Sequence, residues 1–145
     1  MYMPFVLDPE ALPPPDGVDV VIFPEFIDGD FGIYRSNLIP MKKELAEVGV
    51  RAEYAHPPDR RTWLREYSAE GLALNIALGL GTSGAVAILQ TVLTRKQAGR
   101  VKVKITTARK VRGRTSWDPE FVEFEGTAEE VAALVEVWQG NGGAE

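Results

Sequence analysis

The pattern of apolar and polar positions predicts several short strands. Residues 18–23 (VDVVIF) are β-branched and aromatic and end before Pro24, which is typical of a strand. Residues 50–54 (VRAEY) and 101–105 (VKVKI) alternate apolar with charged residues, which predicts strands with one face in water. Residues 121–125 (FVEFE) follow the same pattern. We expect them to pair antiparallel with 101–105, so that glutamates face lysines.

A different spacing predicts a first amphipathic helix. Met41, Leu45 and Val48 recur at i, i+4 and i+7 after Pro40, a residue suited to a first helical position. Gly49 follows as a natural residue just past the helix end. Residues 40–48 are therefore expected to form a short helix of about nine residues.

A second helix is predicted near the C-terminus. Residues 127–130 (TAEE) have the sequence of a capping box, and apolar residues follow at i, i+3, i+4 and i+7. These apolar positions are Val131, Leu134, Val135 and Trp138. Residues 60–67 (RRTWLREY) are expected to form a helical turn, and residues 112–114 (RGR) a turn between strands.

The longest apolar stretch, Gly71–Leu93, has 23 residues, no charge, and ten Leu, Ile or Val side chains. Burying them is worth roughly 15–30 kcal/mol before any cost is subtracted. We expect a long apolar helix packed on the protein's own sheet. Glycine in a helix costs about 1 kcal/mol relative to alanine, so the helix should be hinged at its glycine-rich part. The hinge residues are Gly79, Gly81, Thr82, Ser83 and Gly84.

Two alternatives remain open for this stretch. One is a membrane helix, since about 20 apolar residues cross a bilayer, with Arg95 and Lys96 on the cytoplasmic side. The other is a nucleotide-binding turn, because residues 79–84 (GLGTSG) match G-x-G-x-x-G. That fingerprint requires a preceding strand and an acid about 20 residues on. Residues 69–78 look helical, and no acid follows at that spacing.

The order of elements predicts an α+β fold, with a small sheet of about four strands and helices packed on one face, including the long glycine-interrupted helix. With 145 residues, the chain is expected to form a proline-rich N-terminal arm (1–17), a single domain (18–139) and a C-terminal tail (140–145). There is no cysteine, and the N-terminus lacks the basic region of a signal peptide, so a cytoplasmic location is expected.

No residue pattern points to catalysis. The single histidine, His56, stands beside two prolines and has no assignable nucleophile or acid partner, so it is interpreted as a loop residue. We therefore expect a protein that is not an enzyme, with no catalytic residue, metal or cofactor.

Charge is distributed unevenly along the chain. The net charge is −5, yet no Asp or Glu lies between Glu70 and Asp118. Nine of the 16 basic residues fall in this interval: Arg95, Lys96, Arg100, Lys102, Lys104, Arg109, Lys110, Arg112 and Arg114. This basic patch is a candidate binding surface for an anionic partner. The first interpretation is a solvated strand face paired with the acids of residues 120–125. As a binding surface, the patch is expected to meet a protein before anionic lipid, and lipid before nucleic acid, because it lacks the aromatic residues that stack single-stranded bases.

The arrangement of several segments is familiar. An amphipathic helix and a charged strand lead to Pro57-Pro58, then to the apolar stretch, to Thr94-Arg95-Lys96, and to the strands at 100–105 and 122–125. With the final helix, this order resembles the effector-associated constant component family of bacterial conflict systems over about residues 18–138. The proline-rich arm and the long connection at 106–117 depart from the family pattern.

The resemblance implies a small non-enzymatic component encoded beside variable effectors such as peptidases. We therefore expect an adaptor of a bacterial conflict or antiviral defence system, which assembles with itself or with an effector. The first alternative is a membrane-associated component whose helix 71–93 enters lipid, and the second is a nucleotide-binding domain that uses the Gly79–Gly84 turn.

Overall fold

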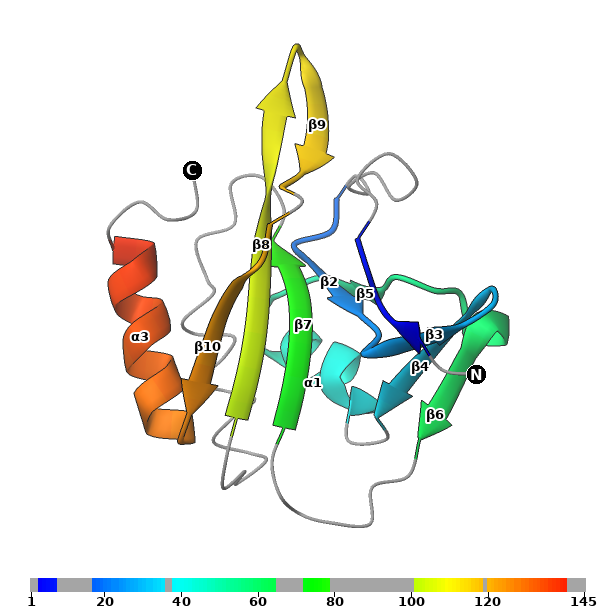
Figure 1. Cartoon of the computed structure of the whole chain (residues 1–145). Helices are drawn as coiled ribbons and strands as arrows, with labels where there is room; N and C mark the ends of the chain where they lie inside the picture. Colours follow the sequence, from blue (N-terminus) through cyan, green and yellow to red (C-terminus); the bar gives the residue numbers. More distant parts are fainter. Residues whose placement is uncertain are drawn as a thin grey trace.

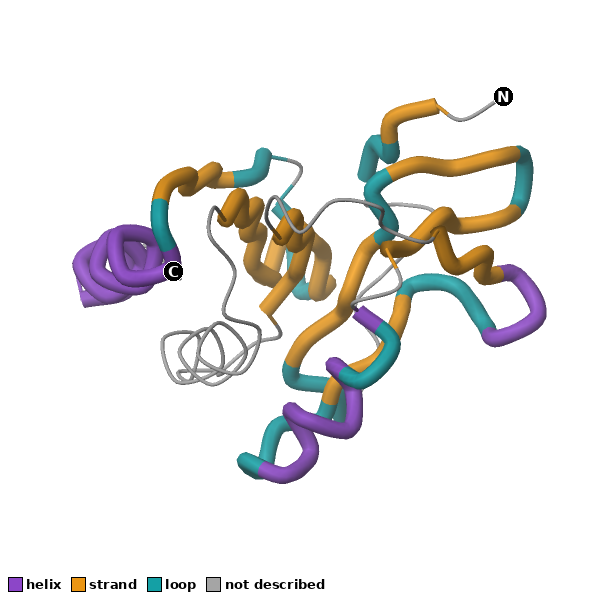
Figure 2. The backbone as a smooth tube through the Cα atoms, turned by 90° about the horizontal axis from the view of Figure 1, so that it is seen from below, coloured by secondary structure: helices purple, strands orange, loops and turns teal. Residues whose placement is uncertain are grey.

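The structure is a computed structural model, which describes residues 3–7, 17–35, 38–64, 72–78, 101–118 and 120–140. Over these residues the chain is mainly β, with two sheets and two α-helices (Figure 1). Figure 2 looks along the strands of the larger sheet and shows helix α3 (Ala128–Gly140) beside one edge of that sheet. The smaller sheet lies beyond the other edge.

The larger sheet is curled and has the strand order β10-β8-β7-β2-β5, with β9 paired to β8 beyond this path. Its strands are β2 (Val20–Phe23), β5 (Ala52–Tyr54), β7 (Leu72–Leu78), β8 (Val101–Val111), β9 (Arg114–Trp117) and β10 (Val122–Gly126). Strand β7 is antiparallel to β2 and parallel to β8, while β10 is antiparallel to β8. The sheet is therefore mixed, with β7 at its centre.

The smaller sheet has the order β1-β3-β4-β6. Its strands are β1 (Met3–Pro4), β3 (Phe26–Asp28), β4 (Phe31–Arg35) and β6 (Arg61–Leu64). A tight turn joins β3 to β4, and its Gly29 has a φ of +60°, which glycine adopts without steric cost. The N-terminal residues belong to this sheet because Met3 and Pro4 pair with Ile27 and Phe26.

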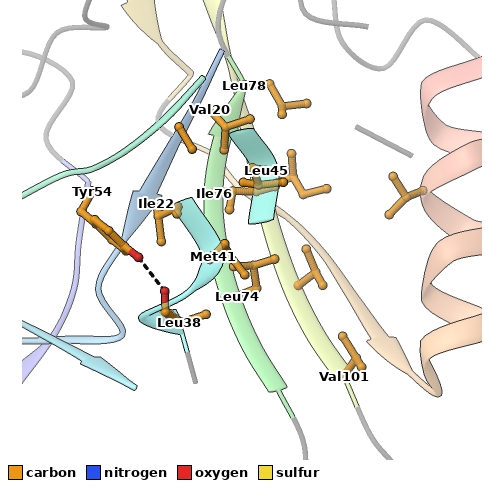
Figure 3. Packing of buried hydrophobic residues seen from close by; sticks show 14 of the residues in the cluster. Val20, Ile22, Leu38, Met41, Leu45, Tyr54, Leu74, Ile76, Leu78 and Val101 are labelled. Carbon is orange, nitrogen blue, oxygen red and sulfur yellow. Dashed lines mark hydrogen bonds between the residues drawn. The ribbon is translucent and has the colours of Figure 1, made fainter. Parts of the chain in front are cut away.

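The main core lies on one face of the larger sheet. Leu74, Ile76 and Leu78 of β7 point into it and are each 1% exposed. Figure 3 shows these side chains beside Met41 and Leu45 of helix α1 (Met41–Glu47). Helix α3 covers the same face through Val131 and Val135. A second core on the opposite face contains Leu7, Val21, Phe23, Ala77, Ala108 and Trp117.

Several predictions are confirmed. Strands form at 20–23, 52–54, 101–111 and 122–126, and β10 pairs antiparallel with β8, which sets Glu123 opposite Lys104. The register follows from burying the alternating apolar residues while leaving the charged residues in water.

The two predicted helices also form. The capping box of α3 is made in both directions, since the backbone N–H of Glu130 donates to Thr127 Oγ1 at 3.2 Å and the N–H of Thr127 donates to Glu130 Oε1 at 3.2 Å. Helix α1 ends before Gly49, whose φ is +81°. Its apolar face is narrower than predicted, because Val48 is 44% exposed.

The predicted α+β class is wrong. The larger sheet alone has more strands than the four expected, and β1, β3, β4 and β6 form a second sheet that the sequence analysis did not foresee. Residues 61–64, placed in a helical turn, form strand β6, which pairs in parallel with β4 after a 3₁₀ turn at Pro58–Arg60. Pairing with β4 outweighs the weak local preference of the segment.

The expected long apolar helix at Gly71–Leu93 is also wrong. Residues Leu72–Leu78 form the central strand β7, which pairs with β2 on one side and β8 on the other. A strand buried on both faces is apolar at almost every position, so its sequence resembles that of a buried helix. Residues 79–100 lie outside the described residues. In the described part of the chain, no helix has the length and apolar character needed to cross a membrane.

The central position of β7 predicts a strong dependence of stability on its side chains. Replacing the 1% exposed Ile76 by alanine (Ile76→Ala) removes buried methyl groups and leaves a cavity, so the free energy of unfolding should fall by about 2–5 kcal/mol. Val137→Ala, at a 62% exposed position, should change it by less than about 0.5 kcal/mol. Urea unfolding of both variants measures the difference, and equal losses would contradict the assignment of β7 to the core.

Candidate functional site

A two-stranded ribbon extends past the end of the larger sheet. Strand β8 pairs with β10 as far as Ile105 and with β7 as far as Thr107, and beyond this point it pairs only with β9. We call residues 108–117 the basic ribbon. Figure 1 shows that it projects beyond the rest of the described chain. At its tip Arg112 and Gly113 have φ values of +52° and +78°, which is typical of a two-residue type I′ hairpin turn.

The base of the basic ribbon is held firmly. Trp117 is 2% exposed and packs edge-to-face on Phe23, with ring centroids 6.3 Å apart. Next to it, the Thr106 hydroxyl donates to the carbonyl oxygen of Asp118 at 2.5 Å, and the Asp118 N–H donates to the carbonyl oxygen of Thr107 at 2.9 Å. The ribbon is thus anchored in the second core, and its direction is fixed by packing.

The tip of the basic ribbon is positively charged and open to water. Lys110, Arg112 and Arg114 are exposed, and Arg109 lies opposite Ser116 in the β8–β9 register. The sequence places no carboxylate anywhere in residues 71–117, so none belongs to the ribbon. Four cations within six positions create a local positive potential on a chain whose net charge is −5.

The predicted basic patch is therefore divided. Lys102 and Lys104 lie on the sheet itself, opposite Glu125 and Glu123 of β10. Lys102 Nζ is 3.1 Å from Glu123 Oε1, and this carboxylate raises the pKa of Lys102. These two lysines belong to a charge-balanced sheet surface. Three more members, Arg95, Lys96 and Arg100, lie outside the described residues, as do the hinge residues Gly79, Gly81, Thr82, Ser83 and Gly84.

A cluster of rings, not foreseen from the sequence, joins the two sheets. Tyr34 of β4 contacts Tyr54 of β5 and Trp63 of β6, with centroid distances of 5.5 and 5.4 Å. The guanidinium of Arg61 lies over the Tyr54 ring at 4.4 Å. The Tyr54 hydroxyl donates to the carbonyl oxygen of Leu38 at 2.6 Å, as drawn in Figure 3. We call Tyr34, Tyr54, His56 and Trp63 the aromatic junction.

His56 belongs to this junction rather than to a free loop. Its ring fits against Gly32, where a Cβ atom would lie 2.8 Å from His56 Cε1. The His56 N–H donates to the Tyr34 hydroxyl oxygen at 3.2 Å, and the same oxygen is hydrogen-bonded to His56 Nδ1, 3.1 Å away. The sequence signal that could have found it is the combination of Gly32 and Tyr34, two residues apart on one strand.

Burial sets the protonation of the junction. Desolvation, followed by the nearby Arg61 charge, lowers the pKa of His56 below its usual 6.5. Desolvation likewise raises the pKa of the Tyr34 and Tyr54 hydroxyls. All three groups are therefore held neutral near pH 7, and the arrangement favours a structural role.

A shallow groove lies between α1 and the edge strand β5. Its volume is about 400 Å³, and its lining includes Ala46, Val50 and Ala52. Lys42 Nζ and Glu53 Oε1 pair across it at 2.8 Å. The described residues contain no group of three or more His, Cys, Asp or Glu side chains that could hold a metal ion. The groove thus offers an apolar floor and one ion pair, without an arrangement for chemistry.

The glycine-rich segment has a different context from the one predicted. The residues before Gly79 form strand β7, and β7 is parallel to β8, the next described strand along the chain. A strand before G-x-G-x-x-G and a parallel strand after it are two parts of the context that a dinucleotide-binding fingerprint requires; the third is a helix that starts at the motif, and residues 79–100 lie outside the described residues. The acid of that fingerprint is missing, because the first carboxylate after Glu70 is Asp118.

Comparison with protein-family models, curated proteins and solved structures finds no match to this chain.

The lowered pKa of His56 predicts a pH-dependent stability. In the unfolded chain His56 binds a proton near pH 6.5, whereas the folded state resists protonation, so the unfolded state gains protons first as the pH falls. The free energy of unfolding should therefore decrease as the pH drops below about 6.5. Urea unfolding between about pH 7.5 and 5.5 measures this decrease.

The matched control is His56→Gln, which keeps a polar side chain but does not titrate in that range. It should remove the part of the slope that belongs to the histidine and leave the part due to carboxylates. An identical slope in both proteins would show that His56 is not held neutral by the junction.

Proposed function

We propose that this protein is a non-enzymatic adaptor of a bacterial conflict system, and that it binds an effector protein through the basic ribbon. The observation that carries the proposal is the ribbon itself. A pair of strands anchored by the buried Trp117 presents Lys110, Arg112 and Arg114 to water at its tip. The resemblance to effector-associated constant components supplies the expected kind of partner.

The shape and charge of the ribbon favour a protein surface as its target. The tip, residues 110–116 (KVRGRTS), has hydroxyl and cationic side chains but no aromatic ring for base stacking. The rest of the chain is acidic overall, which disfavours a long polyanion that must pass over more of the surface. A small acidic patch on a protein can bind the ribbon tip without coming close to the acidic remainder of the chain.

The aromatic junction supports a role without catalysis. The single histidine packs into this cluster, and its Nδ1 atom is hydrogen-bonded to the Tyr34 hydroxyl at 3.1 Å, which is a contact within the fold. The cluster joins two sheets and holds the body that carries the ribbon.

The proposal is tested by co-expressing the chain with the product of its neighbouring gene. Wild type should co-purify as a complex whose mass, by light scattering, is the sum of both chains. Arg112→Glu/Arg114→Glu should weaken the complex at least about tenfold, because two attractive charge pairs become repulsive. The reversed pair Lys43→Glu/Arg51→Glu, at exposed positions elsewhere, changes the net charge equally and should have little effect.

Two results would overturn the proposal. If co-expression yields no complex, the neighbouring gene product is not the partner. If Arg112→Glu/Arg114→Glu weakens the complex no more than the control pair does, the ribbon is not the binding surface.

A second function, nucleotide binding at the glycine-rich segment, is favoured by one observation. Strand β7 ends at Leu78, directly before Gly79-Leu80-Gly81, and runs parallel to β8. The positive charge that follows in sequence suits phosphate groups, although the acid that would bind a ribose is missing.

Isothermal titration with ATP, NAD⁺ and adenosine tests this function. Phosphate-dependent binding would appear with ATP and NAD⁺ but not with adenosine, and Gly81→Val should reduce it at least about tenfold by blocking close backbone approach. If none of the three ligands binds the wild-type protein at millimolar concentration, the nucleotide function is excluded.

A further inference from the structure

We propose that the basic ribbon of one copy docks on the outer face of helix α3 of a second copy, so that copies associate head to tail. This inference deepens the proposed function and rests on the basic ribbon being an interaction surface. It names a second partner for the same ribbon, another copy of the chain, which would compete with the effector for the ribbon tip.

The first observation is the separation of charge along the chain. Nine cations and no acid lie between residues 95 and 114, whereas no Lys or Arg follows Arg114. The C-terminal acids are Asp118, Glu120, Glu123, Glu125, Glu129, Glu130, Glu136 and Glu145. The chain thus has one basic and one acidic segment, adjacent in sequence.

The fold pairs the two segments only in part. On the sheet, Lys102 and Lys104 face Glu125 and Glu123, and these four charges balance. The cations of the ribbon tip have no such partner strand, because β9 contributes Thr115 and Ser116 opposite Lys110 and Arg109. The tip therefore keeps its positive charge, and Glu129 and Glu136 of α3 are exposed to water.

The outer face of α3 carries exposed apolar side chains with an acidic rim on one side. Val131 and Val135 are buried against the sheet, but Leu134 and Val137 are 48% and 62% exposed. At about 100° per residue, Leu134 and Val137 lie about 60° apart around the helix, and exposed Glu129 and Glu136 lie beyond Val137, on the side away from Leu134. Large exposed apolar side chains next to carboxylates are typical of a protein contact surface.

The two surfaces are complementary in chemistry. Arginine and lysine side chains can lay their aliphatic stems on apolar atoms while their charged ends reach carboxylates. The arginines of the ribbon tip can in this way cover Leu134 and Val137 and pair with the carboxylates of the rim.

One copy cannot satisfy both surfaces by itself. Helix α3 begins just after Gly126, which pairs with Val101 at the start of β8, while the ribbon tip follows Val111 at the other end. At about 3.3 Å per residue, these two ends of β8 are roughly 30 Å apart. Figure 1 shows the ribbon tip and α3 well separated. Helix α3 runs back alongside the sheet (Figure 1), so Leu134 and Val137 lie roughly 9–14 Å along it and still roughly 20 Å short of the tip, measured along β8. Pairing between them is therefore intermolecular, and a contact between unlike surfaces leaves each end free to continue.

Sedimentation velocity of the purified full chain tests the proposal. At about 0.01 M salt the weight-average sedimentation coefficient should rise with protein concentration, and at about 1 M salt it should return to the monomer value as screening shortens from about 30 to about 3 Å. Arg112→Glu/Arg114→Glu alone, and Glu129→Lys/Glu136→Lys alone, should each raise the dissociation constant at least about tenfold. Lys43→Glu/Arg51→Glu, at exposed positions, should leave it within about twofold.

Mixing the two variants gives the deciding result. The acidic tip of the first matches the basic α3 of the second, and the basic tip of the second matches the acidic α3 of the first, so association should return in the mixture. Circular dichroism and thermal unfolding confirm that each variant is folded, and Glu136→Lys alone serves if Glu129→Lys disturbs the start of α3.

Three results would overturn the inference: a monomer at every concentration in low salt, association that ignores the reversed charges, and no rescue in the mixture. Binding of a duplex DNA oligonucleotide to the wild-type chain, without self-association, would assign the ribbon to another partner. These outcomes are separate from the effector test. A complex with the effector can persist when self-association fails, and self-association can persist when no effector binds.

Discussion

The structure depends on the placement of β7 between β2 and β8. All seven of its residues pair with β8, and the last four, 75–78, also pair with β2. Leu74, Ile76 and Leu78 fill the main core, while Ala77 faces the second one. Because β7 and β8 are parallel, β8 starts beside Leu72 and runs on past Leu78. The extra length of β8 becomes the basic ribbon, so the position of the candidate site follows from the register of the central pair.

The sequence predicted those elements whose pattern has a period. The charged alternation at 101–105 and 122–125 identified both strands and their pairing, and the capping box at Thr127–Glu130 located the start of α3. The pattern did not predict β7, because burial on both faces removes the alternation that distinguishes a strand from a helix. It did not predict β6 either, since Arg61–Leu64 becomes a strand only by pairing with β4, whose residues lie almost thirty positions earlier.

The candidate site was predictable in composition but not in arrangement. The cations between Arg95 and Arg114 are evident in the sequence, yet which of them are balanced depends on where β10 stops pairing with β8. Lys102 and Lys104 fall before that point, whereas Lys110, Arg112 and Arg114 fall after it. The aromatic junction was missed for a similar reason. Tyr34, Tyr54 and Trp63 come from three strands, and no local pattern connects them.

The contrast between an acidic body and a basic ribbon restricts what the ribbon can approach. A charge on a projecting tip acts within about 10 Å at 0.1 M salt, so the tip attracts a carboxylate patch while the acidic body, farther away, contributes little repulsion. A partner that is anionic over a long surface lies close to both the tip and the acidic body. The repulsion from the body then offsets the attraction to the tip. The same contrast explains why the outer face of α3 fits the ribbon of another copy: it offers carboxylates and apolar atoms within one short helix, and no cation follows Arg114 in the sequence to compete for them. Selectivity then comes from the size of the acidic patch as much as from its charge.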